Sequence, residues 1–578
     1  MINFKLNPYT SFVESHLIPG ATQYAVAHRL TGEVLELTAE VYSSLQGMKP
    51  GSEISVSEEQ VQSLGERTWL KQLIIKEFVI PQGRDPLGYI VDQLAARPIQ
   101  NPALTYKNEN GETILVRLSM AQQVYARKKD ELPEVIEERL SPTARAILQL
   151  ADGSRTLQEI FGAVKPNEGN DLLADSDFTE AIEFLTSQER QLIKFTRQTE
   201  DLRDPFRPVN TVPRNLIQSN RPQPSTSSDR SSVVDFHLEG IEDASWEFDQ
   251  IEATVNHSLR FPDRMLGGLD YGSRFCEATL RPEVVPALRT KQQLEVLEVG
   301  GGTGTFAQSF IKQSQENERA DLNYHVLDLS PVLMANQRKV LADLLPEQKH
   351  FHQDATKFDL RQRFDLILSN EVIADFPVAS VQSVPASNGQ DSSSWTGEGV
   401  AYLRKYDLTT EGTPTNFKIN VGAMMFIERC WNHLNPGGTL VLSEYGSATR
   451  YPVQAYHLNH EEFSIQFSHL AECATKIGFD CRLLSLREFL ALDDEVAVFS
   501  GREEHLLCLN HIVKQHGITF PYAIFSQDEF KKRAGGISEE IELRGISFLP
   551  LNKGFYFGPR IEEFMVLIMK RPQSSQNQ

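Results

Sequence analysis

A run of glycines after an apolar, strand-like segment is the first pattern in the chain that could do chemistry. Glu298, Gly300, Gly302 and Gly304 form E-x-G-x-G-x-G, directly before a segment of helical periodicity. Glycines at a strand-to-helix turn let the backbone approach a ligand closely, and the amides of the helix start then face that ligand. This turn by itself fits nicotinamide, flavin and methyl-donor cofactors alike.

Two further acids end the next strand-like segments. Asp328 closes YHVLD, where a carboxylate can accept from both hydroxyls of a ribose. Asp354 follows a short third strand in HFHQDATKF, where it could accept from an adenine amino group. Either acid alone is more often a surface or capping residue, but the ordered set with Glu298 favours a nucleoside cofactor. A methyl donor carries an α-amino group and a sulfonium in place of a pyrophosphate, so Glu298 favours a methyl donor.

The elements that must position these residues alternate in type from residue 293 onward, which predicts a mostly parallel α/β sheet. A polar insertion at 379–417 follows one strand end, and either a substrate lid or a disordered insertion fits it. The apolar run FMVLIM and the alternating run GFYFGP predict a closing antiparallel pair. The other predicted strands are LEVLEVG, YHVLDLS, FDLILSNEV and TLVLSEYG, and the predicted helices are FAQSFIKQSQ, VLMANQRKVLADLL and MMFIERCWNHL.

These stretches resemble class I S-adenosylmethionine-dependent methyltransferases and, more narrowly, the MidA family. The matching segments are LEVGGGTGTF, LDLSPVLMANQRKVL with its Gln337, and LILSNEVIADFPV, within a resemblance covering residues 269–479. The resemblance implies a Rossmann-like fold and S-adenosylmethionine as the cofactor. The residues expected to bind it are Glu298, Gly300, Gly302, Gly304, Asp328, Asp354 and Asn370.

The acceptor site is expected just after FDLIL, where Asn370 and Glu371 stand. Asn370 could bind an acceptor through its amide oxygen, and Glu371 could pair with a guanidinium or act as a base. A helix-start carboxylate is the alternative interpretation of Glu371. Tyr271 completes the catalytic candidates, and Arg274 and Tyr445 are second-rank candidates for closing the site.

The acceptor positions depart from the MidA pattern, a family that includes a mitochondrial arginine methyltransferase of complex I assembly. The family's Asn-Glu-x-x-Asp-Ala-x-Pro becomes Asn-Glu-Val-Ile-Ala-Asp-Phe-Pro here, so Ala374 and Asp375 are swapped. Glu444 replaces an aspartate, and Ser464 stands where a histidine is frequent. Arginine is therefore not implied as the acceptor.

The chain is organised around a Pro- and Ser-rich linker at 201–235, which follows two small units at 1–100 and 101–200 and precedes a methyltransferase domain at 236–578. In the second unit, Ser141 before Pro142 predicts a helix start, and Thr156 predicts another after a turn at 152–154. These α+β units resemble winged-helix PqqD and RiPP-recognition-element domains, which hold a peptide against a strand–helix cleft. A structural or dimerising role fits the units as well.

The net charge of −21 argues against nucleic-acid binding, which needs a basic surface. The five cysteines show no metal-ligand spacing, so we expect no metal site and a reducing, cytoplasmic location. No apolar run approaches a membrane span. We therefore expect a methyltransferase of a peptide or protein side chain or amide, whose substrate the N-terminal units hold and which could form a homodimer. A small-molecule natural-product methyltransferase and a non-catalytic cofactor-binding assembly protein remain alternatives.

Overall fold

The structure is a computed structural model of the 578-residue chain. It describes all residues except 1, 19–20, 29, 32, 48–52, 57–68, 76–77, 84–96, 101–103, 110–111, 119–134, 167–173, 188–189, 191, 197–232, 236, 239–240, 242–253, 319, 385–393, 411–412, 458–459, 502, 522, 536, 538–545, 554–559 and 574–578. The predicted strand GFYFGP and most of the predicted linker lie outside the described residues.

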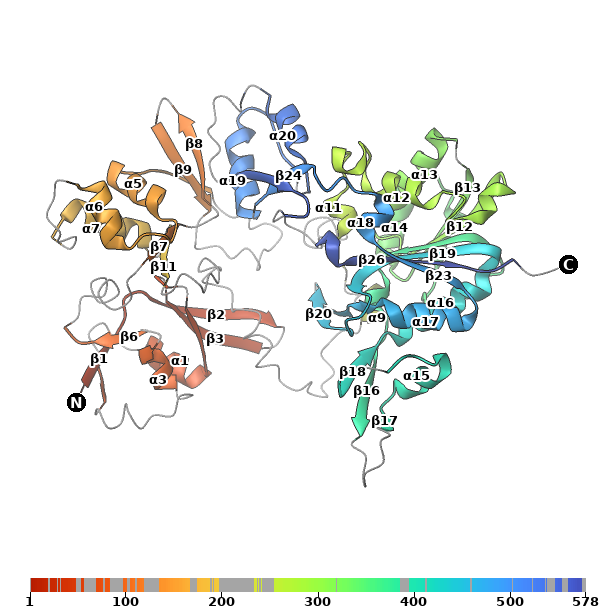
Figure 1. Cartoon of the computed structure of the whole chain (residues 1–578), viewed down its shortest axis with the longest axis horizontal. Helices are drawn as coiled ribbons and strands as arrows, with labels where there is room; N and C mark the ends of the chain where they lie inside the picture. Colours follow the sequence, from red (N-terminus) through yellow and green to blue (C-terminus); the bar gives the residue numbers. More distant parts are fainter. Residues whose placement is uncertain are drawn as a thin grey trace. The chain divides into compact units, whose positions relative to one another are not determined.

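The chain folds as two compact units, which are described separately (Figure 1). Unit 1 contains residues 1–226, 501–520 and 534–546, and unit 2 contains residues 227–500, 521–533 and 547–578. The predicted methyltransferase domain at 236–578 differs from this division, because the chain leaves unit 2 after Ser500 and enters unit 1 twice.

Unit 2 is built on a large sheet with strand order β14-β13-β12-β15-β19-β26-β23. Strands β14, β13, β12, β15 and β19 run parallel, and β26 lies antiparallel between β19 and β23. The order reverses at β12, as it does at the switch point of doubly wound α/β sheets. The strands are β12 (Gln293–Val299), β13 (Asp321–Asp328), β14 (His350–His352), β15 (Phe364–Asn370), β19 (Leu434–Ser447), β23 (Asp480–Ser485) and β26 (Phe564–Lys570).

The predicted α/β fold of this region is confirmed, including FMVLIM as the antiparallel strand β26. Helices α12 (Tyr271–Thr279) and α13 (Thr305–Glu316) pack over one face of the sheet, and α16 (Val421–His433) and α17 (Phe467–Ile477) pack over the other. Alternate residues of β12 serve the two cores, with Val296 in one and Leu297 in the other.

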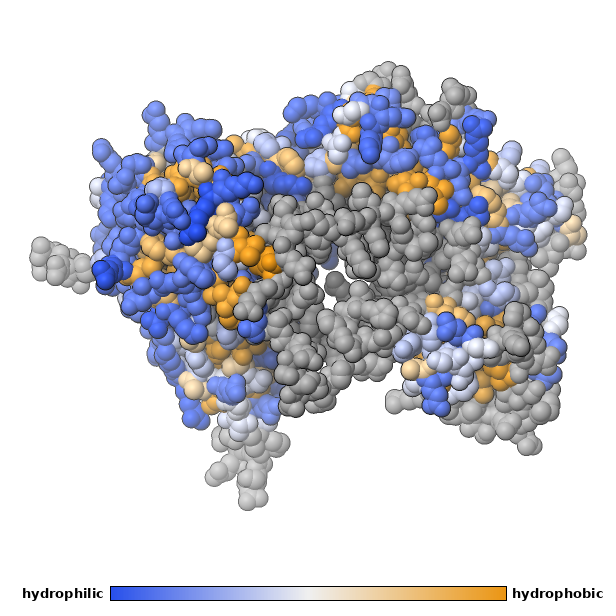
Figure 2. All heavy atoms as spheres, turned by 180° about the vertical axis from the view of Figure 1, so that it is seen from behind, coloured by the Kyte–Doolittle hydropathy of each residue, from blue (hydrophilic) through white to orange (hydrophobic). Residues whose placement is uncertain are grey.

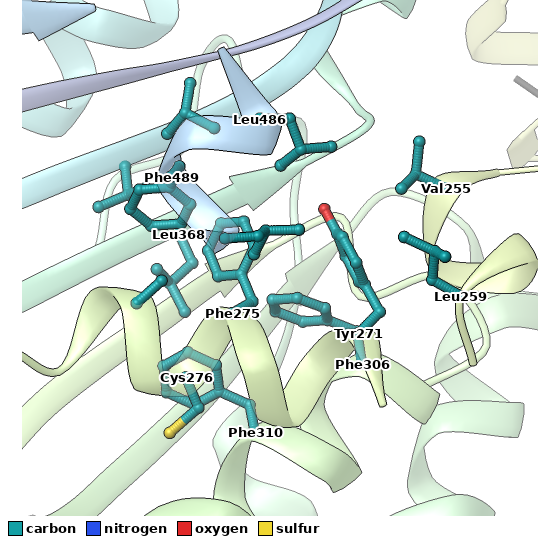
Figure 3. Close-up of a cluster of buried hydrophobic side chains, with 14 of the residues drawn as sticks. Val255, Leu259, Tyr271, Phe275, Cys276, Phe306, Phe310, Leu368, Leu486 and Phe489 are labelled. Carbon is teal, nitrogen blue, oxygen red and sulfur yellow. The ribbon is translucent and has the colours of Figure 1, made fainter. Parts of the chain in front are cut away.

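A group of aromatic side chains lies among the aliphatic residues of the core under the first face (Figure 3). Phe275 and Phe306 meet edge to face at 5.3 Å, and Phe275 meets Phe489 of α18 (Leu486–Leu490) at 5.0 Å. Tyr271 lies in the same cluster, its ring 5.8 Å from that of Phe275. Such pairs contribute beyond the area that they bury, so they help to hold α12, α13 and α18 together.

The insertion at 379–417 is folded where the structure describes it. Strands β16 (Ala379–Val384), β17 (Ser394–Thr396) and β18 (Asn416–Ile419) form a sheet with β16 in the centre, beside helix α15 (Val400–Tyr406). The rings of Trp395 and Phe417 meet at 5.4 Å. The hairpin of β20 (Gln454–His457) and β21 (His460–Phe463) follows β19 in sequence. The short strand β22 (Ile465–Gln466) then pairs with β19. A small core therefore orders the described insertion.

Unit 1 begins with the sheets β5-β1-β6 and β2-β3-β4, packed with helices α1 and α3 around Phe4, Tyr42 and Phe78. The strands are β1 (Ile2–Leu6), β2 (Thr10–Ile18), β3 (Ala21–His28), β4 (Val34–Leu37), β5 (Glu53–Val56) and β6 (Val79–Pro81), and the helices are α1 (Ala39–Gln46) and α3 (Trp69–Ile75). In the second part of unit 1, β7 (Arg97–Gln100) pairs with β11 (Ile193–Thr196), and a separate three-stranded sheet has the strand order β10-β9-β8. The helices of this part are α5 (Pro142–Leu150), α6 (Leu157–Val164) and α7 (Ser176–Thr186).

Both predicted helix starts in unit 1 are confirmed. Ser141 caps α5 by accepting from the amide of Ala144, with Pro142 in the first turn. Thr156 caps α6 in a capping box with Glu159. The turn between the helices uses Gly153 at φ +81°. Winged-helix similarity remains a prediction.

Helix α19 (Glu503–Lys514) comes from the late part of the sequence and packs on β8 (Thr105–Glu109), β9 (Glu112–Leu118) and β10 (Val135–Arg139). Cys508 and Ile512 of α19 bury against Val116. The ion pair between Lys107 and Glu137 lies beside them at 2.8 Å, and His511 also reaches Glu137. Unit 1 therefore includes residues that lie in sequence between strands β23 and β26 of unit 2.

Polar side chains cover most of the described surface of unit 2 in the view of Figure 2, with smaller apolar areas between them. In the described part of the chain, no helix combines the length and hydrophobicity needed to cross a membrane.

Ile512→Ala tests the assignment of α19 to unit 1. Ile512 is 1% exposed, and truncating such a side chain costs about 2–5 kcal/mol. We expect amide hydrogen exchange to accelerate in β8, β9 and β10 and to stay unchanged in β12 and β13. His516→Ala, at an exposed position beyond the same helix, is the control. Faster exchange only in unit 2 would contradict the assignment.

Candidate functional site

A cavity of about 770 Å³ opens in unit 2 where the strand order reverses, at the carboxyl ends of β12, β13 and β15. Both its size and its position are typical of small-molecule sites in open α/β sheets. The predicted site residues that line it are Glu298, Gly300, Gly302, Asp328, Asp354, Asn370 and Glu371.

The glycine turn packs closely against its neighbours at Gly300 and Gly304. Gly300 has φ +75°, and a Cβ there would lie 2.2 Å from Cγ2 of Val372. Gly302 also has positive φ, but open space surrounds it on the cavity side. Gly304 caps α13 at φ +87°, where a Cβ would lie 3.1 Å from the Cα of Gln337. Gly304 therefore serves helix packing and does not line the cavity, while the other two shape its floor.

Asp328 is held in place by its neighbours. It is buried, and its carboxylate accepts from the amide of Ser330 at 2.9 Å and from Nε2 of Gln337 at 2.7 Å. The same Nε2 donates to the carbonyl of Gly302 at 3.0 Å. Burial raises the pKa of Asp328, and these hydrogen bonds oppose the shift. Gln337, in helix α14 (Pro331–Val340), thus ties the expected ribose acid to the glycine turn.

Glu298 is buried at the end of β12, where the hydroxyl of Tyr324 donates to it at 3.3 Å. Burial raises its pKa to about 8, and the nearby charge of Asp328 adds to the shift. A carboxyl group in this state gains from a cation arriving beside it, because the cation favours the ionised form.

Asp354 is half-buried at the cavity rim. Its carboxylate accepts from the amide of Thr356 at 2.8 Å and from the hydroxyl of Thr356 at 2.7 Å, and Lys357 lies 3.0 Å away. Partial burial acts to raise the pKa of Asp354, but the hydrogen bonds and the lysine outweigh burial and lower it. The acid is therefore ionised and turned toward the cavity wall.

A hydrogen-bond chain runs through the predicted acceptor residues. The Tyr271 hydroxyl donates to Oδ1 of Asn370 at 2.6 Å, and Nδ2 of Asn370 donates to Glu371 at 3.1 Å. Tyr271 is fully buried and lies behind Asn370, outside the cavity lining. Burial raises its pKa well above the usual range. Tyr271 was expected to be catalytic, but this geometry assigns it a positioning role.

Glu371 anchors a neighbouring helix start. Its φ is +56°, and its carboxylate accepts from the amides of Val255 at 2.8 Å and Asn256 at 3.2 Å, which begin helix α11 (Val255–Ser258). Burial raises its pKa to about 7, although these bonds oppose the shift. Glu371 therefore does bind a helix start, as its alternative interpretation predicts, but the helix is α11 and not one that follows Glu371 in sequence. Bound in this way, Glu371 holds α11 over the cavity.

Arg274 and Tyr445 do not line the cavity. The guanidinium of Arg274 donates to the carbonyls of Leu490 at 2.6 Å and Ala491 at 3.2 Å, which fastens the end of α18. Tyr445 packs its ring 5.9 Å from that of Phe564 in β26. The structure gives both residues contacts that support the fold, so it does not bring them to the site.

The swapped Asp375 does face the cavity. It lies in the 3-10 turn η6 (Ile373–Asp375), and its Oδ2 lies 3.3 Å from Nε2 of His237. His237 was missed in the sequence, because nothing around it distinguishes it from the end of the linker predicted at 201–235. Glu444 accepts from the amides of Ala374 at 3.2 Å and Tyr445 at 2.8 Å, and burial raises its pKa well above the usual range.

Residues 282–460 match a protein family described as "Putative S-adenosyl-L-methionine-dependent methyltransferase". This match covers β12 to β20, and therefore the glycine turn, Asp328, Asp354 and Asn370. Together with the strand order and the cavity, the match supports a Rossmann-like methyltransferase fold with S-adenosylmethionine as its cofactor for this part of unit 2. The relation to the MidA family stays a prediction.

The chain is 35% identical over 81 residues to malonyl-[acyl-carrier protein] O-methyltransferase 1 of Ilyobacter polytropus. This segment is 14% of the chain and 28% of that relative, so the chain spans little more than a quarter of it. A Burkholderia thailandensis protein bound to S-adenosyl-homocysteine is similar at 16% identity and TM-score 0.30, covering 57% of this chain and 88% of that one. An uncharacterized protein of the same organism is similar at 17% identity and TM-score 0.31, with 52% and 79% covered.

Gly300→Ala is expected to weaken S-adenosylmethionine binding at least about tenfold, because positive φ and the contact with Val372 together exclude a Cβ. Isothermal calorimetry measures the affinity. Gly268→Ala is the matched control: it has φ +85° and open space around it, so it introduces the same backbone strain away from the cavity. Equal affinities in both variants would show that the turn does not contact the cofactor.

The raised pKa of Glu298 predicts that the protein releases a proton when it binds the cofactor. Its pKa of about 8 in the empty site means that it is mostly protonated at pH 7, and a bound ammonium or sulfonium lowers that pKa. Binding then releases a proton, and affinity rises from pH 6 to pH 8.5. Calorimetry in buffers of different ionisation enthalpy measures the release. Glu298→Gln should abolish it, and a release that persists in this variant would assign the proton to another group.

Proposed function

We propose that the protein methylates a peptide or protein, on a side chain or a backbone amide, using S-adenosylmethionine. The observation that carries the proposal is the continuous cavity that joins the cofactor residues Glu298 and Asp328 to the polar residues Asn370, Glu371 and Asp375. One cavity can then hold the methyl donor and the acceptor together, which methyl transfer requires.

The chain's own residues would act mainly by orientation. S-adenosylmethionine supplies a methyl group on a positively charged sulfur, and transfer to an acceptor proceeds by in-line displacement. Asp328, fixed by Gln337, holds the ribose end, and the glycine turn admits the backbone of the donor. Asn370 offers its amide to the acceptor while Tyr271 fixes its orientation. Helix α11, fastened by Glu371, limits the access of water.

Unit 1 supports a peptide substrate. In the described part of its three-stranded sheet, β10 pairs with β9 alone and is therefore an edge strand. Its acids are neutralised within the unit: Glu137 pairs with Lys107, and Glu138 pairs with Arg117 and Arg190. An edge whose charges are satisfied can accept an extended peptide as an added strand. We propose that unit 1 holds the substrate chain in this way.

Transfer of tritium from methyl-labelled S-adenosylmethionine to an immobilised random-peptide array tests the function. We expect the full chain to label a subset of peptides, and Asp328→Ala to label none, because it loses the ribose contact. Calorimetry with S-adenosylmethionine and S-adenosylhomocysteine accompanies the assay. Binding of both without transfer to any peptide would favour a small-molecule acceptor. Absence of binding to the folded wild type would reject the methyltransferase proposal altogether.

A further inference from the structure

A segment outside the family match lines the cavity. Helix α9 (Val233–Asp235) and the following His237 and Leu238 belong to unit 2, and we call these described residues the strap. Val234 and His237 line the same cavity as the cofactor residues. The family match begins only at residue 282, so the match gives the strap no role.

A polar contact between His237 and Asp375 fastens the strap to the cavity wall. Nε2 of His237 lies 3.3 Å from Oδ2 of Asp375, and the two side chains are 16% and 22% exposed. Asp375 follows Asn370 and Glu371 by a few residues, so the contact joins the strap to the acceptor side of the cavity. Asp328, the acid expected at the ribose, is close enough to contribute to the electrostatic field at His237. His237 is therefore placed between the two halves of the site.

Val234 and Leu238 of the strap are exposed. Val234 is 43% exposed and Leu238 is 37% exposed, although both are large hydrophobic side chains. Val234 lines the cavity, so a molecule that fills the cavity would cover part of its side chain. The strap thus offers both a polar fastening and an apolar surface to a bound ligand.

We propose that the strap closes over the bound methyl donor and that the His237–Asp375 pair is the clasp which keeps it closed. The inference rests on the proposed function, since it assumes that the donor occupies this cavity. Donor entry and product release then require the clasp to open. Because unit 2 begins at residue 227, the strap is also the first described part of unit 2 after the division from unit 1.

The clasp has a defined pH dependence. Burial acts to lower the pKa of His237, but the hydrogen bond and the charge of Asp375, together with the charge of Asp328, outweigh burial and raise it above 6.5. A raised pKa means that the ion pair is complete at low pH and is lost as the pH rises through the pKa of the folded state. The clasp therefore slows product release more at pH 6 than at pH 8.5.

Stopped-flow dissociation of S-adenosylhomocysteine from the full chain tests the clasp. At pH 6 we expect His237→Gln and Asp375→Asn each to dissociate about fivefold faster than the wild type, and the double variant to match the single ones. At pH 8.5 the ratios should approach one. Dividing each variant rate by the wild-type rate at the same pH removes the contribution of Glu298, which all of them share. Asp528→Asn, which breaks the exposed pair with Arg264 in unit 2, should leave the rate unchanged.

The outcomes separate the clasp from the proposed function. A wild type that binds neither S-adenosylmethionine nor S-adenosylhomocysteine rejects the function, and the clasp with it. A wild type that binds both, with variant rates equal to its own at pH 6, overturns the clasp and leaves the function standing. Thermal melting checks that each variant folds. An NMR titration of His237 provides a second measurement: its pKa must fall in Asp375→Asn, and an unchanged pKa would also overturn the clasp.

Discussion

The left-handed turn at the end of β12 is the constraint on which the rest of unit 2 depends. Gly300 lies so close to Val372 that no side chain fits between β12 and the segment after β15. The same loop is bound by Gln337, whose amide also holds Asp328. The ends of three neighbouring strands are therefore fixed to one another around a single turn. Any ligand of the cavity meets a floor that is already assembled, which lowers the entropy lost on binding.

Buried carboxyl groups around this turn make the empty site electrostatically unfavourable. Glu298, Glu371 and Glu444 all have raised pKa values because burial removes the water that would stabilise their charge. Glu371 and Glu444 are compensated by backbone amides, which fasten α11 and η6. Glu298 accepts a long hydrogen bond from Tyr324 at 3.3 Å. It lines the cavity, where a positively charged methyl donor would restore its ionised form.

The chain passes between the two units more than once. Helix α19 packs beside Val116 in unit 1, although its residues lie in sequence between strands β23 and β26 of unit 2. The strap follows the first segment of unit 1 in sequence, and its residues Val234 and His237 line the cavity of unit 2. A truncated methyltransferase domain would leave the apolar face of α19 without its partners, so experiments on this protein need the full chain.

The sequence alone determined the α/β order, the helix caps at Ser141 and Thr156, and the glycine turn with Asp328 and Asp354, because each depends on residues near one another in the chain. Only the tertiary structure decided that Tyr271 stands behind Asn370, that Glu371 binds α11, and that His237 meets Asp375. These contacts join residues about 100 or more positions apart, as their separations of 99, 116 and 138 show. Local periodicity and propensity contain no information about such pairs, since packing of the whole sheet brings them together.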